Sequence, residues 1–146
     1  MDKDELLKLD NQVCFALYAC SREITKLYRP ILSDIGLTYT QYITMLALWE
    51  KDSVTVKELG SRLLLDSGTL TPLLKKLESM GHIVRGRDKV DERNLVIKVT
   101  EKGMQLKELA YQVPLRLFKQ LNLTPEEAIV FRDQAYGVIA RMDSNI

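Results

Sequence analysis

Residues 65–100, LDSGTLTPLLKKLESMGHIVRGRDKVDERNLVIKVT, decide the fold of this chain. Asp66 and Ser67 are suitable caps for the start of a helix, and Gly81 stands where a glycine usually ends one. Between them, leucines recur at helical spacing, which predicts one buried stripe. Pro72 is compatible with this helix if it lies in about the first turn. The opposite face carries small polar and basic side chains: Ser67, Thr69, Thr71, Lys75 and Lys76.

A basic β-hairpin is predicted after this helix. Residues 82–87 and 95–99 alternate like two strands, and the charged loop 88–93 joins them. Between residues 75 and 93 there are six basic and four acidic side chains, a net charge of +2. A short polar helix followed by a basic hairpin is the outline of a winged helix-turn-helix. Its helix enters the major groove of DNA, and the hairpin reaches the backbone or the minor groove.

The expected DNA contacts come from both parts of this unit. Hydroxyls near a helix start can approach base edges and phosphates closely, and long cations on a wing can enter a narrow minor groove. Arg93 either contacts DNA or forms a salt bridge with Asp91 that shapes the wing. An ordinary solvated helix face is the alternative, which the adjoining basic hairpin disfavours. The expected DNA-binding residues are Ser67, Thr69, Thr71, Lys75, Arg87, Lys89 and Arg93.

Helix signals divide the chain on both sides of this unit. A first long helix is expected from about residue 6 or 11 to residue 28, with its end disturbed by Pro30. Thr38 and Thr55 are each followed three residues later by Gln or Glu, a capping box that predicts helices to about residue 50 and over 56–63.

The C-terminal part predicts two more helices. Thr100 begins a long helix that Pro114 should kink or end. Thr124 and Pro125 begin a last helix that reaches about residue 142. The fold class is therefore mainly α with a small β-hairpin: a winged helix-turn-helix with N- and C-terminal dimerisation helices.

The length of 146 residues suits one winged-helix domain over 1–146. Its DNA-binding core is expected at about 38–100 and its dimerisation helices at about 6–32 and 104–146. These flanking helices carry apolar stripes that the small core cannot cover, so two chains are expected to bury them against each other. A two-fold dimer also places two recognition helices about 34 Å apart, in successive major grooves.

Net charge, hydropathy and the cysteine count bear on the partners, the compartment and the possible metal or disulfide sites of the protein. The formal net charge of +1 neither favours nor excludes nucleic acid. The charged segment 1–10 is unlike a signal peptide and no apolar run is long enough to span a bilayer, so we expect a cytoplasmic protein. Cys14 and Cys20 point about 120° apart on one helix and cannot form a disulfide with each other unless that helix unwinds. With His82 far away in sequence, no metal site and no cofactor is expected.

Three motifs resemble one family. They are N-Q-x-C-F-x-x-Y at residues 11–18, D-S-G-T-L-T-P-L-L-K-x-L-E at residues 66–78, and D-E-R at residues 91–93 of the wing. With them, essentially the whole chain resembles the MarR (multiple antibiotic resistance regulator) family, and within it the repressors that sense organic hydroperoxides. The resemblance implies a homodimeric repressor, not an enzyme, that leaves its operator DNA when a cysteine near the start of the first helix is oxidised.

The resemblance places the reactive cysteine at Cys14 and its hydrogen-bonding tyrosines at Tyr28 and Tyr39. One branch of the family has a second, resolving cysteine near the C-terminal helices, and this chain has no cysteine after Cys20. The one-cysteine route is therefore favoured. In that route the sulfenic acid is trapped by a low-molecular-weight thiol or is oxidised further.

The residues around Cys14 suit this chemistry. The thiolate attacks a peroxide, and both a helix N-terminus and phenol donors stabilise that form. Tyr18 lies one turn further on the same helix face. Tyr28 lies about 21 Å along the same helix, so it can reach only the Cys14 of a partner chain. The proposed site therefore needs a dimer with antiparallel first helices.

Three other functions are open at this stage. The first is a regulator of the same family that binds a small lipophilic or phenolic ligand, with Cys14 as an ordinary packed residue and Tyr28 and Tyr39 as interface aromatics. The second is a thiol peroxidase, which the lack of a resolving cysteine and of a thioredoxin-like βαβ pattern disfavours. The third is a winged helix used only for protein assembly, which a DNA-binding assay decides. Cys20 is expected to have only a packing role.

Overall fold

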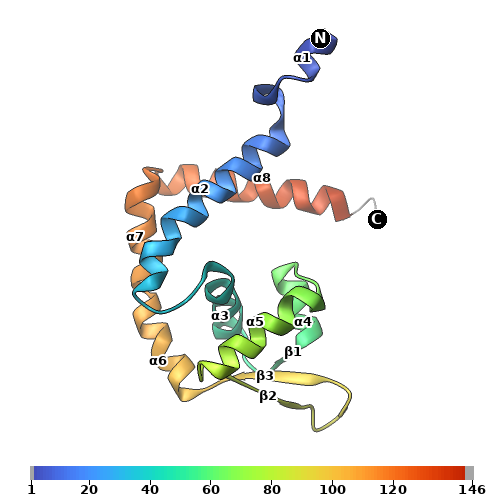
Figure 1. Ribbon diagram of the computed structural model, residues 1–146, viewed down its shortest axis with the longest axis vertical. Helices are drawn as coiled ribbons and strands as arrows, with labels where there is room; N and C mark the ends of the chain where they lie inside the picture. The colour runs from blue at the N-terminus through green and yellow to red at the C-terminus, as the bar shows by residue number, and fades with distance from the viewer. Residues whose placement is uncertain (1, 144–146) are drawn as a thin grey trace.

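The computed structural model describes residues 2–143 and confirms a mainly helical fold with a small antiparallel sheet (Figure 1). The elements are α1 (Lys3–Leu6), the 3-10 helix η1 (Leu9–Asn11), α2 (Val13–Ser33), α3 (Tyr39–Glu50), β1 (Val54–Thr55), α4 (Val56–Leu63), α5 (Ser67–Ser79), β2 (Ile83–Arg87), β3 (Leu95–Val99), α6 (Glu101–Ala110), α7 (Gln112–Leu121) and α8 (Pro125–Asp143).

The helix-turn-helix forms as its caps predict. The Thr55 hydroxyl accepts from the Glu58 N–H at 3.1 Å and begins α4. Leu64 then takes a left-handed conformation with φ 56°, which turns the chain toward α5. Both helices bury apolar stripes against α3 and the sheet. The buried core of this unit is formed by Met45, Leu48, Leu59, Leu70, Leu74, Leu77, Ile83 and Ile97.

The wing is part of a three-stranded sheet with the order β1-β3-β2. The predicted hairpin is confirmed, and its strands pair from Ile83 opposite Val99 to Arg87 opposite Leu95. The sequence interpretation missed β1, which pairs with the other edge of β3. A strand of two residues is too short for an alternating pattern to show, and Thr55 was visible only as a helix cap.

Two expectations about proline are wrong. The first long helix does not end near Pro30 but continues to Ser33, because Ile31 and Leu32 are each 1% exposed and their packing holds the next turn in place. Pro72 is the sixth residue of α5 and lies beyond the first turn. There too, buried leucines on both sides keep the helix continuous despite the missing N–H donor.

Pro114 ends the preceding helix, as predicted, and the helix ends one turn before the proline itself. Its nitrogen cannot donate to the carbonyl of Ala110. α6 ends at Ala110, and α7 begins at Gln112 with Pro114 as its third residue. The predicted start of the last helix is confirmed, because the Thr124 hydroxyl and the Glu127 carboxylate each accept from the other residue's N–H, at 3.1 and 2.9 Å.

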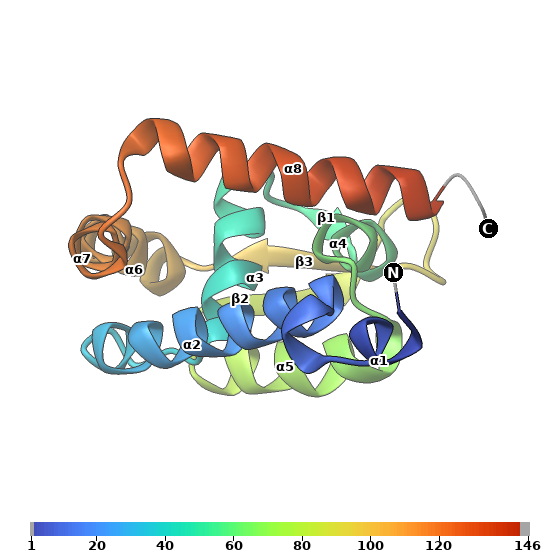
Figure 2. The same ribbon diagram turned by 90° about the horizontal axis from the view of Figure 1, so that it is seen from above.

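The N- and C-terminal helices carry surfaces that the winged unit does not cover. Viewed from above, α2 and α8 run along opposite sides of the molecule, with α3 and the sheet visible between them (Figure 2). No residue of α8 from 125 to 142 is buried. Large apolar side chains on these helices are exposed, among them Val13, Leu17, Phe118, Val130 and Phe131. None of the helices described in residues 2–143 has the length and apolar character needed to cross a membrane.

Candidate nucleic-acid interface and sensing cluster

The recognition helix α5 begins at a well-formed cap. The Asp66 carboxylate accepts the Thr69 N–H at 2.7 Å, and this hydrogen bond lowers the pKa of Asp66 below its ordinary value. The cap satisfies one of the free N–H groups of the first turn. It also fixes the direction in which the following polar side chains leave the helix.

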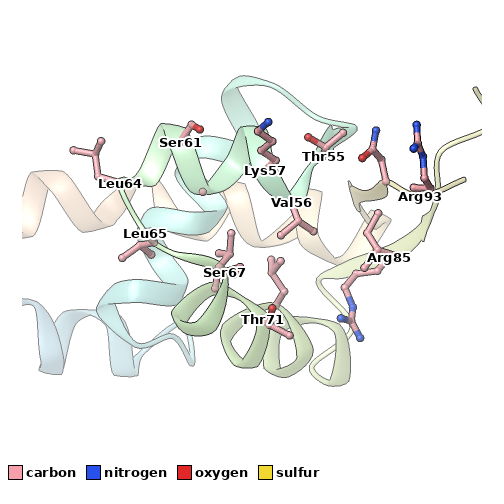
Figure 3. Close-up of a pocket in the computed structure, with 15 residues that line it drawn as sticks. Thr55, Val56, Lys57, Ser61, Leu64, Leu65, Ser67, Thr71, Arg85 and Arg93 are labelled. Carbon is pink, nitrogen blue, oxygen red and sulfur yellow. The ribbon is translucent and has the colours of Figure 1, made fainter. Parts of the chain in front are cut away.

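The structure divides the predicted polar face of α5 into two flanks. Ser67 and Thr71 line a groove of about 560 Å³ that Lys57 and Ser61 of α4 also line (Figure 3). Thr69 is two residues from each of them and therefore points about 160–200° away around the helix. Ser67 and Thr71 thus share one surface with α4 and the wing, and Thr69 belongs to the other flank. Lys75 is exposed beyond the groove.

Arg85 closes the wing end of this groove, a role that the sequence interpretation missed. Its guanidinium donates to both oxygens of the Glu78 carboxylate, at 3.1 and 3.3 Å, and its backbone N–H donates to the same carboxylate at 3.0 Å. The hydrogen bond from Arg85 lowers the pKa of Glu78. This pair connects the last turns of the recognition helix α5 to β2 of the wing. The spacing of seven residues across a glycine turn gave no signal in the sequence.

The tip of the wing carries the predicted Asp91–Arg93 salt bridge. Two contacts of 3.0 and 3.1 Å join the guanidinium to the carboxylate, and they hold the pKa of Asp91 below its ordinary value. Arg93 nevertheless lines the same groove as Arg85 and remains largely exposed. Arg87 donates to the Glu92 carbonyl at 3.1 Å, and Lys89 is exposed. All three cations therefore lie on one accessible hairpin.

The base of the wing is tightly packed. The His82 carbonyl accepts the Thr100 N–H at 3.0 Å, which closes the hairpin. The His82 side chain is buried, and its Nδ1 has no hydrogen-bond partner within the described residues. Burial and the nearby Lys102 lower the pKa of His82.

Tyr28 and Tyr39, which the family resemblance assigns to the sensing site, lie together in the structure. Their ring centroids are 4.9 Å apart. Tyr42, which the sequence interpretation did not include, packs on Tyr28 at 5.8 Å. Burial raises the pKa of all three phenols. Nearby phenols add to the effect: Tyr39 and Tyr42 at Tyr28, Tyr39 at Tyr42, and Tyr136 of α8 at Tyr39. The hydroxyls are therefore kept protonated and able to donate. The i, i+3 spacing of Tyr39 and Tyr42 on one helix was the available signal.

Cys14 is the second residue of α2 and is exposed. It lies on the same continuous helix as Tyr28, about 21 Å away along the axis. The structure thus supports the expectation that Tyr28 cannot reach Cys14 of its own chain. Tyr18 is exposed and stacks under the Arg22 guanidinium at 5.3 Å, outside the tyrosine cluster. Cys20 is also exposed, so within the single chain the packing role expected for it is not confirmed, and both cysteines are free.

The Asn11 and Gln12 side chains join the start of α2 to the preceding segment. The Gln12 amide donates to the carbonyls of Leu6 and Lys8, each at 2.8 Å, and the Asn11 amide donates to the carbonyl of Glu5 at 2.7 Å. The one-turn helix α1 is too short to be stable alone. The two amides therefore hold the preceding segment, residues 3–10, against the N-terminal end of α2. Within the described part of the chain, no group of three potential ligands is arranged for a metal ion.

Together, a recognition helix, a basic wing and flanking helices with exposed apolar faces define the class of winged-helix transcriptional regulators. The family model described as transcriptional regulator SarA/Rot matches residues 26–109. The chain belongs to the MarR/SarA-type family of transcriptional regulators, and its predicted place near the organic hydroperoxide regulators is confirmed.

The comparisons with individual proteins agree with this placement. An organic hydroperoxide resistance transcriptional regulator of Bacillus subtilis is 51% identical over 77% of this chain and 77% of the relative. Reduced AbfR bound to DNA, from Staphylococcus epidermidis, is 34% identical with a TM-score of 0.78, over 97% of this chain and 99% of AbfR. A disulfide-formed structure of AbfR is 35% identical with a TM-score of 0.66, over 97% of both chains.

Proposed function

We propose that this protein is a homodimeric, redox-sensing repressor that leaves its operator when an organic hydroperoxide oxidises Cys14. The observation that carries the proposal is the packing of Tyr28 on Tyr39 at 4.9 Å, with protonated hydroxyls, at the end of α2 opposite from Cys14. The relationship to a hydroperoxide resistance regulator supports it. The relationship to AbfR supports the DNA-binding part of the proposal, because AbfR has been solved bound to DNA both in its reduced and in its overoxidized form.

The site is proposed to form between two chains. If the α2 helices of the two protomers pack antiparallel, Cys14 of each faces the tyrosines of the other. The exposed apolar side chains of α2, α7 and α8 supply the surface that such packing buries. In this proposal residues 38–100 form the DNA-binding core, and residues 6–32 and 104–143 form the dimer; residues 144–146 of the expected dimerisation segment lie outside the described residues.

The proposed chemistry has two steps. The Cys14 thiolate attacks one peroxide oxygen, an S–O bond forms, and the O–O bond breaks. The cysteine is oxidised to a sulfenic acid, and the hydroperoxide is reduced to an alcohol after its alkoxide takes up a proton. A low-molecular-weight thiol then attacks the sulfenic sulfur, giving a mixed disulfide and water. One peroxide is consumed per cysteine, so the protein is proposed to act as a sensor and not as an enzyme.

Specificity for organic peroxides follows from the surroundings of Cys14. Val13, Phe15 and Leu17 are 70%, 40% and 52% exposed in the single chain. Apolar side chains on both sides of the thiol favour a peroxide with an apolar tail over hydrogen peroxide.

The DNA contacts are proposed to come from the flanks of α5 and from the wing. Hydroxyls of Ser67, Thr69 and Thr71 are proposed to reach base edges and phosphates. The cations Lys75, Arg87, Lys89 and Arg93 supply phosphate or minor-groove contacts.

The proposed role of the tyrosines is tested with Tyr28→Phe and Tyr39→Phe in a Cys20→Ser background. Loss of either hydroxyl removes a donor to the thiolate, so alkylation at neutral pH is expected to slow by about tenfold. Operator binding by the reduced variants is expected to match that of the parent protein. Unchanged alkylation rates in both variants contradict the proposal.

A second function has one observation in its favour. A cavity of about 440 Å³ is lined by Tyr42, Leu46, Trp49, Tyr111 and Pro114 among others, which is large enough for a small phenolic or lipophilic ligand. If such a ligand is the signal, Cys14→Ser keeps the full response. The same variant therefore separates the two functions.

A further inference from the structure

Tyr42 is the most deeply placed ring of the tyrosine cluster. It is 4% exposed, whereas Tyr28 and Tyr39 are half-buried. Tyr39 and Tyr42 are three residues apart on α3, so they lie on the same face of that helix. The Tyr28 ring from α2 meets both, at centroid distances of 4.9 and 5.8 Å. These distances are in the range of favourable aromatic contacts.

Packing alone holds the two outer tyrosines. Within residues 2–143, the structure gives the Tyr28 and Tyr39 hydroxyls no hydrogen bond, so neither ring is fixed by its polar end. The rings are tilted by 45° and 44° at the two contacts. Because Tyr42 is fixed in the core, its ring is a firm surface that limits where the Tyr28 ring can lie on that side.

We propose that Tyr42 is a positioning residue for the sensing site, and that its ring, not its hydroxyl, holds Tyr28 in the orientation from which it donates to the partner's thiolate. The inference rests on the proposed function, since it assigns Tyr42 a role at the same site. Without this ring, Tyr28 gains room to turn and its hydroxyl loses a defined direction. A hydrogen bond weakens steeply as its angle departs from linearity, so the thiolate loses part of its stabilisation.

The test uses the full-length dimer with Cys20→Ser, so that Cys14 is the only thiol. The alkylation rate of Cys14 is measured against pH for the parent and for Tyr42→Phe, Tyr42→Leu and Tyr42→Met. Tyr42→Phe keeps the ring and is expected to stay within about twofold of the parent rate. Tyr42→Leu and Tyr42→Met are expected to move the midpoint of the rate profile upward by about one pH unit, a tenfold loss of rate at neutral pH.

A matched control separates positioning from loss of stability. Leu48 is a fully buried residue two turns further along α3, and Leu48→Ala weakens the same core without touching the cluster. It is expected to lower the unfolding temperature and leave the midpoint pH unchanged. The variant Tyr42→Met is a second ring-free replacement that is usable if Tyr42→Leu does not fold.

Each remaining outcome has a defined meaning. If the folded Tyr42→Leu or Tyr42→Met protein has the same midpoint pH of alkylation as the parent protein, the role of Tyr42 is overturned and the proposed function is not. Equal impairment of Tyr42→Phe also overturns it, because the hydroxyl then acts directly. If Cys14 of the parent protein reacts no faster than a cysteine in an unstructured peptide, the proposed function fails, and the role of Tyr42 fails with it.

Discussion

The indole nitrogen of Trp49 donates a hydrogen bond of 3.1 Å to the carbonyl oxygen of Gly103. Trp49 lies in the last turn of α3, whose first turn carries Tyr39 and Tyr42, and Gly103 lies in the first turn of α6. Gly103 in turn packs against the backbone of His82 at the base of the wing. The helix that carries two of the clustered tyrosines is therefore connected through Gly103 of α6 to the base of the wing.

Gly103→Ala is expected to destabilise the protein strongly. A Cβ at this position lies 2.7 Å from a Val99 methyl and still closer to the His82 carbonyl oxygen, so the wing base has to shift. The expected loss of unfolding free energy is about 3 kcal/mol, measured by urea denaturation. Gly86→Ala is the matched control, since a Cβ there meets no atom within 4 Å. A Gly103→Ala protein as stable as Gly86→Ala contradicts the close packing at this junction.

His82 is expected to make stability depend on pH. Burial, and then the charge of Lys102, lower its pKa in the folded state below the ordinary value of 6.5. The unfolded chain therefore binds the proton more readily, and protonation favours unfolding. The contribution is fully present above about pH 6.5 and is lost as the pH falls below that value.

The check is urea denaturation at pH values from about 7.5 to about 5, a range that spans the ordinary histidine pKa of about 6.5. The His82→Leu protein is the comparison. The variant is expected to lose the part of the pH dependence that begins near neutrality. Identical slopes for the parent and His82→Leu rule out a buried, neutral histidine at the wing base.

The wing cations are expected to hold DNA through its phosphates. Arg87→Ala should weaken binding to all operator variants and lower the slope of log affinity against log salt by about one per subunit. Lys119→Ala is the control, because α7 lies at the opposite side of the molecule from the wing tip (Figure 1). Titration of operator DNA at several salt concentrations measures both quantities. Wild-type affinity and slope for Arg87→Ala exclude this contact.

Oxidised protein is expected to carry a mixed disulfide or an over-oxidised cysteine, and not a disulfide between chains. The chain has no cysteine beyond Cys20, which removes the distal resolving partner. The protein is treated with an organic hydroperoxide and free cysteine, then examined on a non-reducing gel and by mass spectrometry. The gel is expected to show a band at the mass of a single chain, and mass spectrometry is expected to show the added mass of one small thiol. A mainly covalent dimer on the non-reducing gel contradicts the one-cysteine route.

Local sequence signals predicted the winged unit well, because its elements are specified by neighbours in the chain. Caps at Thr38, Thr55 and Asp66 are each formed by side chains three residues from their partners, and the leucine stripe of α5 has a clear period. The predicted effects of Pro30 and Pro72 on their helices were wrong, because burial of residues on the next turn outweighs the lost hydrogen bond. That burial depends on tertiary packing, which no local pattern contains.

The site was predictable in part for the same reason. Motifs within one helix pointed to Cys14 and to the polar side chains of α5. Contacts between distant elements were invisible: Arg85 with Glu78 crosses a turn, Trp49 reaches Gly103 over 54 residues, and Tyr42 joins Tyr28 only after α2 and α3 pack. The splitting of Thr69 from Ser67 and Thr71 follows from helix geometry, but the position of the groove had to come from the fold.

Oxidation of Cys14 is proposed to control operator binding. The most direct measurement is operator affinity with and without an organic hydroperoxide, such as cumene hydroperoxide, for the parent, Cys14→Ser and Cys20→Ser proteins. Peroxide is expected to weaken operator binding by the parent and by Cys20→Ser by at least about tenfold, equal to about 1.4 kcal/mol. Cys14→Ser is predicted to bind with parent affinity and to ignore peroxide. A Cys14→Ser protein that still releases DNA on oxidation contradicts the account.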